Sequence, residues 1–136
     1  MNNTARQQAQ AQIAAFIGRR QLAALIAGCR GAEGAWFRAK LAELAQTFET
    51  MHKVYEQDGK GDAAIVHLHY FTSGGDWYIT ERDTSVVQYQ AFGSADLGYG
   101  SELGYISIAD LIAHGAELDL HWTPCTLGEA LARKAV

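Results

Sequence analysis

The chain has 136 residues, of which 49% are hydrophobic and 19% charged, and its net charge at pH 7 is −4. This length suffices for one globular domain with a core that needs no disulfide or metal. No apolar run approaches the roughly 18 residues of a membrane helix, and the polar N-terminus lacks the apolar centre of a signal peptide. Two isolated cysteines, Cys29 and Cys125, lie in no metal or redox motif. We therefore expect a cytoplasmic protein without a cofactor or a membrane partner.

The charge is divided unevenly along the chain. Through Lys53 there are seven Lys or Arg residues and three Asp or Glu, whereas from Val54 onward there are four and twelve. Such an asymmetry could steer a charged partner, or it could simply draw the two parts of the chain together. The absence of a dense basic patch argues against a nucleic-acid partner. Arg19, Arg20 and exposed aromatic rings would still suit one alternative, a single-stranded nucleic-acid binding module.

The first part of the chain, residues 1–55, is predicted to be helical. Between Thr4 and Cys29 apolar residues follow a helical spacing that shifts at Gly18, where a bend or break is plausible. A second helix is expected to start near Ala35. Its apolar residues recur at alternating spacings of four and three: Phe37, Leu41, Leu44, Phe48, Met51 and Tyr55. This seam is typical of a helix packed on its own sheet, but it could also form a homodimer.

Residues 63–136 are predicted to hold a sheet, after a polar loop at 56–62. Strands are expected at 63–71, 76–81 and 86–92, with a tight turn at 72–75. The glycine-rich segment 93–104 is expected to be an irregular loop. A short helix at 108–114 should be capped by Ser107 and end at Gly115. A last strand at 118–122 and a final short helix capped by Thr126 complete the chain.

These elements predict a single α+β domain. Two N-terminal helices would pack on one face of a mainly antiparallel sheet, with short helices near the C-terminus. Helices that precede the strands, instead of alternating with them, argue against a parallel sheet of βαβ units.

Five sequence blocks occur in order in the second part of the chain. They are HYF at 69–71, GGDWYITERD at 74–83, AFGSADLG at 91–98, ELGYISIADL at 102–111 and ELDLHWTPCTL at 117–127. In this order they resemble an uncharacterised domain family carried by plasmids, conjugative elements and phages, over roughly residues 66–131. The family has no assigned activity or catalytic residues, and its members lie near anti-restriction genes. The resemblance implies a non-enzymatic accessory protein that binds a protein of the host or the element, with inhibition of a host defence system as a hypothesis.

His67 and His69 form a His-x-His pair on the expected strand 63–71. Alternate residues of a strand point to one face about 7 Å apart, which suits two ligands of one metal ion. A third ligand could come from the neighbouring strands, from His121, Asp119, Asp76 or Glu81. Such a site would make a metal-dependent enzyme, an alternative to a binding protein. The competing interpretation is that both histidines merely occupy a half-exposed strand face.

Tyr99 and Tyr105 flank the glycine-rich segment 93–104, which also carries Asp96 and Glu102. Aromatic side chains held out on a loop are typical anchors for a protein partner. We expect these four residues to contact such a partner. The acidic residues around the turns could instead cap those turns, do acid–base work or imitate nucleic-acid phosphates.

Overall fold

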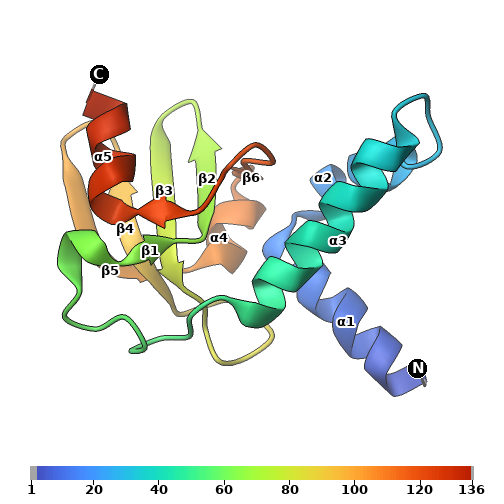
Figure 1. Cartoon of the computed structure of the whole chain (residues 1–136), viewed down its shortest axis with the longest axis horizontal. Helices are drawn as coiled ribbons and strands as arrows, with labels where there is room; N and C mark the ends of the chain where they lie inside the picture. Colours follow the sequence, from blue (N-terminus) through green and yellow to red (C-terminus); the bar gives the residue numbers. More distant parts are fainter. Residues whose placement is uncertain (1–2, 136) are drawn as a thin grey trace.

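The computed structural model describes residues 3–135. Figure 1 shows the N-terminal helices gathered at one end of the molecule, beside a sheet that carries the C-terminal helix. The helices are α1 (Asn3–Phe16), α2 (Arg19–Gly28) and α3 (Gly34–Thr50). The sheet, in the order β5-β4-β3-β2-β6, contains β2 (Leu68–Thr72), β3 (Gly75–Glu81), β4 (Ala91–Asp96), β5 (Ser101–Ile106) and β6 (Glu117–Leu118). All its pairings are antiparallel. The predicted α+β class is confirmed.

Smaller elements surround this sheet. A single turn, η1 (Gly61–Ala63), leads into β1 (Ile65–Val66), which pairs with β7 (Cys125–Thr126) as a separate two-stranded ribbon. The short helices are α4 (Ile108–Ala113) and α5 (Leu127–Ala135). No helix among residues 3–135 is both long and apolar enough to cross a membrane.

The helical part contains three helices instead of two, because the chain breaks at Gly18. A Cβ atom built on Gly18 would lie 2.8 Å from Cγ2 of Ile112, so α4 packs where only a glycine fits. Helix α3 ends at Thr50, and Met51 is already extended. The prediction that places Tyr55 on the helical seam is therefore wrong, since Tyr55 lies in the following loop with φ +79°.

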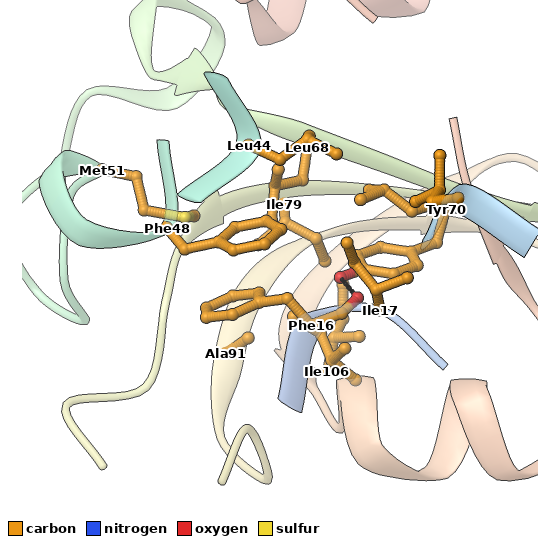
Figure 2. Packing of buried hydrophobic residues seen from close by; sticks show 13 residues of the cluster. Phe16, Ile17, Leu44, Phe48, Met51, Leu68, Tyr70, Ile79, Ala91 and Ile106 are labelled. Atoms are coloured by element: carbon orange, nitrogen blue, oxygen red, sulfur yellow. Dashed lines mark hydrogen bonds between the residues drawn. The ribbon is translucent and has the colours of Figure 1, made fainter. Parts of the chain in front are cut away.

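The main core lies between the helices and one face of the sheet (Figure 2). The rings of Phe16 and Phe48 stack with centroids 4.3 Å apart, which joins α1 to α3. The buried Tyr70 hydroxyl donates to the backbone oxygen of Phe16 at 2.6 Å, which satisfies the end of α1. The seam of α3 faces this core through Leu44 and Phe48, as predicted for a helix packed on its own sheet, and Met51 joins the core just after the helix ends.

A second, smaller core lies on the other face of the sheet. Adjacent residues of β3 divide between the two, since Ile79 belongs to the main core and Tyr78 to the second. Val66 joins Tyr78 in the second core, whereas Leu68 joins Ile79. An uninterrupted strand over 63–71 would place Val66 and Leu68 on one face, whereas in the structure they belong to different cores. The side chains switch from one face of the sheet to the other at His67. This residue lies between β1 and β2 and is part of neither strand.

The region after β3 differs most from the sequence-based expectation. The predicted strand 86–92 is instead mostly a loop, organised by the buried amide of Gln88, which donates to Ser85 and Val86 oxygens and accepts from the Asp83 N–H. The predicted irregular loop 93–104 is instead the β4–β5 hairpin. The predicted strand 118–122 is reduced to β6, which ends at Leu118.

Candidate functional site

A cavity of about 320 Å³ lies where the loop after α3, the end of β3 and the β4–β5 hairpin meet the start of α5. Apolar side chains form much of its wall: Val54, Phe92, Leu103 and Leu127. Polar side chains also line it, among them Glu81, Tyr55 and Tyr105. An apolar cavity with a few convergent polar groups is the usual form of a ligand site. We therefore take this cavity as the candidate site.

Glu81 is the buried carboxylate of the cavity. It is 4% exposed and closes β3, directly after the register of β3 against β4 shifts. Its Oε1 atom accepts a hydrogen bond from the backbone N–H of Tyr55 at 2.5 Å. Burial raises the pKa of Glu81 above its ordinary value, although the hydrogen bond from Tyr55 favours the ionised form. A buried carboxylate with a perturbed pKa in a cavity is a typical functional residue.

Tyr55 adopts a backbone conformation that side chains rarely tolerate. It is the one non-glycine residue with positive φ among residues 3–135, and such a conformation costs on the order of 1–3 kcal/mol. This conformation directs the Tyr55 N–H at Glu81, while the Tyr55 hydroxyl lies 2.7 Å from that of Tyr105. The hydrogen bond with Tyr55 raises the pKa of the Tyr105 phenol. The two tyrosines thus form a bridge of hydroxyls at the cavity.

The loop that carries Tyr55 is fixed to the sheet by Gln57. The buried Gln57 amide donates to the backbone oxygens of Ile65 and Thr80 at 2.9 and 2.8 Å and accepts from the Ile65 N–H at 2.7 Å. One side chain thus satisfies three backbone groups on two strands. The loop that bounds the cavity is therefore fixed to the sheet by these hydrogen bonds.

The four residues expected to bind a partner do not share one surface role. Tyr99 is 97% exposed in the hairpin turn, and Glu102 is exposed on β5. Tyr105 is 56% exposed at the cavity. Asp96 is instead turned toward α5, where its Oδ2 lies 3.8 Å from Nζ of Lys134. Sequence reasoning missed Tyr55 as a site residue, and it considered Glu81 as a metal ligand or as one of the acidic residues around the turns.

The two histidines of the His-x-His pair have separate partners. His67 Nε2 lies 2.8 Å from Nδ1 of His52, in the segment that follows α3. His69 instead lies between two carboxylates, with Nδ1 2.9 Å from Asp119 and Nε2 2.8 Å from Asp76. Among residues 3–135, no three His, Cys, Asp or Glu side chains are arranged as ligands of a metal ion.

Of the other expected metal ligands, Glu81 lines the cavity and His121 lies against the ring of Trp36. Of the expected ligands, His69, Asp76 and Asp119 thus lie together, whereas His67, Glu81 and His121 lie elsewhere.

The two carboxylates around His69 belong to a longer polar network, in which Lys134 contacts Asp76 and Asp96. Partial burial disfavours the ionised form of Asp76, but hydrogen bonds from Lys134 and His69 outweigh it and lower the pKa of Asp76. Because Lys134 lies on α5, these contacts connect α5 to the sheet. Their arrangement is that of a structural network.

His67 predicts a specific loss of stability in weak acid. Burial, and then the neighbouring His52, lower the pKa of His67 from 6.5 to about 4. Below pH 6.5 His67 is therefore protonated in the unfolded chain but stays neutral in the folded chain. The stability that is present above pH 6.5 is lost as the pH falls toward 4. Allowing for solvent screening at this half-buried side chain, we expect a loss of about 1–2 kcal/mol.

Urea unfolding between pH 7 and pH 4 measures this loss. The variant His67→Gln should flatten the pH dependence, whereas the exposed His114→Gln should leave it unchanged. Equal curves for the wild-type chain and His67→Gln would contradict the assignment.

The cavity, the tyrosine bridge and the neighbouring edge strand β5 are the features from which a function can be inferred. Arg19 and Arg20, considered for nucleic-acid binding, are exposed at the start of α2 and contribute nothing to the cavity. Comparison of the chain with protein-family models, with curated proteins and with solved structures finds no match. The function must therefore be inferred from the residues of this chain and their geometry.

Proposed function

We propose that this protein is a non-enzymatic binding protein that holds an extended segment of a protein partner against the outer edge of β5. The observation that carries the proposal is the position of β5 at the end of the sheet. It pairs with β4 along its whole length, Ser101–Ile106, and no strand from residues 3–135 pairs with its other side. An edge strand offers backbone groups that another extended chain can pair with.

The side chains of the hairpin fit such a partner. Four apolar or aromatic side chains of the hairpin are exposed, namely Leu97, Tyr99, Leu103 and Tyr105. Exposed apolar groups on an edge strand normally endanger solubility, so their presence favours a surface that is covered in use. Strand pairing would supply affinity, and alternate side chains would supply selectivity.

The charge of this region favours a basic segment. From Val54 onward the chain carries twelve acidic and four basic residues, and Glu102 lies exposed on β5 itself. An acidic surface attracts a basic partner and raises its association rate at low ionic strength. The proposed occupant is therefore an extended segment that contains Lys or Arg.

The test is partner capture from a cell lysate combined with a matched pair of variants. Leu103→Arg adds a bulky like charge at an exposed residue of β5 beside the cavity, whereas Tyr89→Arg makes the same change at an exposed residue outside the hairpin. We expect the wild-type chain and Tyr89→Arg to capture the same partner and Leu103→Arg to lose it at least tenfold. Bound partner should also protect the amides of 101–106 from hydrogen exchange.

Capture that survives Leu103→Arg, or protection confined to other elements, would overturn the proposal. A concentration-dependent dimer in sedimentation, abolished by Leu103→Arg, would overturn it in another way. In that case a second copy of this chain would occupy the edge, by a surface other than the helical seam through which the sequence leaves a homodimer open.

The accessory role in a mobile genetic element is a further part of this proposal. It is supported by the five sequence blocks that resemble a plasmid and phage family. If the partner belongs to a restriction system, cells that express the protein should accept unmodified plasmid DNA at least tenfold better than cells that express Leu103→Arg. Equal acceptance would remove the host-defence part and leave partner binding standing.

A further inference from the structure

The cavity beside β5 contains an acceptor atom that the protein itself leaves unused. Oε1 of Glu81 is bound by the Tyr55 N–H, but no hydrogen bond reaches Oε2 from residues 3–135. Among the described residues, every side-chain oxygen that is inaccessible to solvent has a hydrogen-bond partner. Oε2 is therefore accessible to solvent, and Glu81 lines the cavity. A carboxylate oxygen in this position is ready to accept a hydrogen bond from a ligand.

The charge of the wall selects the sign of that ligand. The described residues that line the cavity include two carboxylates, Glu81 and Asp58, and no Lys, Arg or His. A carboxylate that is 4% exposed gains most from a partner that carries a positive charge and an N–H donor, because water screens the pair little. An anion would be repelled by both carboxylates.

The rings and apolar side chains select the kind of cation. Tyr105 packs edge-on against Phe92, with centroids 5.7 Å apart, and its hydroxyl meets that of Tyr55. Aromatic faces attract organic cations, and the apolar walls from Leu103 and Leu127 suit a hydrocarbon stem. A hydrated metal ion would lose its water against such walls with only two carboxylates in return. The volume, about 320 Å³, is at the lower end of ligand cavities.

We propose that this cavity binds a protonated amine or guanidinium carried on a short apolar stem, with Glu81 as its acceptor. Such a group occurs in free alkylamines and also as the end of a Lys or Arg side chain. The proposal stands independently of partner binding at β5, although a basic segment on that strand could supply the group.

Butylguanidinium, butylammonium and neutral 1-pentanol are suitable probes, followed by backbone amide shifts in NMR. We expect both cations to shift amides of the loop 55–61 and of Glu81 and Tyr105 in a saturable way, with 1-pentanol at least tenfold weaker. Glu81→Gln keeps the shape and an oxygen for the Tyr55 N–H, and it should weaken butylguanidinium at least tenfold. The matched control Glu102→Gln, an exposed carboxylate on β5 outside the cavity wall, should leave binding unchanged.

Equal binding of 1-pentanol and butylguanidinium, or no saturable shift with any probe, would overturn the proposal. So would equal loss in Glu81→Gln and Glu102→Gln. If Glu81→Gln does not fold, Tyr105→Ala replaces it, since the Tyr105 side chain is largely exposed, and it should weaken both cations several-fold.

The blocked amino acid N-acetylarginine N-methylamide separates the two sources. Tighter binding than butylguanidinium indicates the side chain of a protein partner, and weaker binding indicates a free cation.

Discussion

Replacing Gly93 by alanine should lower the free energy of unfolding by on the order of 3–5 kcal/mol, enough to unfold a marginally stable domain. Gly93 lies in β4 opposite Ile79 of β3. A Cβ atom at this position would lie 1.9 Å from the backbone oxygen of Tyr78 and 3.0 Å from Cα of Ile79. Both obstacles belong to the backbone of the central strand, so no side-chain rotation relieves them.

Gly104 provides the matched control, because it is paired directly with Gly93 across the hairpin. A Cβ atom on Gly104 would meet nothing within 4 Å. In urea unfolding we expect Gly104→Ala to change the free energy by less than about 1 kcal/mol. Similar losses at both positions would show that the cost lies in the β5 strand and not in the approach of β4 to β3.

The same glycine explains why the hairpin is missed in the sequence. The segment 93–104 contains four glycines, a composition typical of loops. Only Gly98 and Gly100 have the positive φ of a turn, at +99° and +102°. Gly93 occupies a strand because another backbone approaches it closely. Composition does not distinguish a glycine required by a turn from one required by a neighbouring strand.

Local capping patterns, by contrast, are predicted correctly. Ser107 caps α4, with its hydroxyl accepting from the Asp110 N–H at 3.1 Å, and Gly115 follows that helix with φ +91°. Thr126 and Glu129 exchange hydrogen bonds at the start of α5. These bonds join residues three apart, so a short stretch of sequence contains both partners.

The candidate site could not be assembled from the sequence in this way. Tyr55 is 26 residues from Glu81 and 50 residues from Tyr105 in the sequence. At such separations no helical or strand periodicity indicates that the residues are neighbours. The sequence places Tyr55 on a helical seam because its spacing from Met51 is that of a helix. The helix ends at Thr50, before Tyr55 is reached, and the loop directs its N–H to the sheet instead. The sequence predicts that Tyr99 and Tyr105 are exposed, but it does not predict which residues they contact.

Replacing Arg82 by methionine should cost about 3–4 kcal/mol of unfolding free energy. Arg82 is 4% exposed, and its guanidinium lies over the ring of Phe16, 5.2 Å from the centroid. It donates to the backbone oxygen of Phe48 at 2.7 Å, in the last turn of α3, and to the Gln12 side chain on α1 at 2.8 Å. A cation at the carboxyl end of a helix is favourable. One side chain thus fastens two helices to the end of β3.

Methionine keeps most of the apolar stem but leaves these acceptors without a donor. Arg82 also donates to backbone oxygens of the following loop, at Asp83 and Ser85, so that loop should loosen as well. Arg38→Met is the matched control, because Arg38 donates to the Cys29 oxygen near the end of α2 but is exposed to water. We expect it to cost less than about 1 kcal/mol in the same urea titration. A comparable loss of unfolding free energy from both variants would mean that the exposed hydrogen bond from Arg38 stabilises the fold as much as the buried ones from Arg82. The join between the helical part and the sheet would then depend on the apolar core around Phe16 and Phe48, and not on the guanidinium that crosses it.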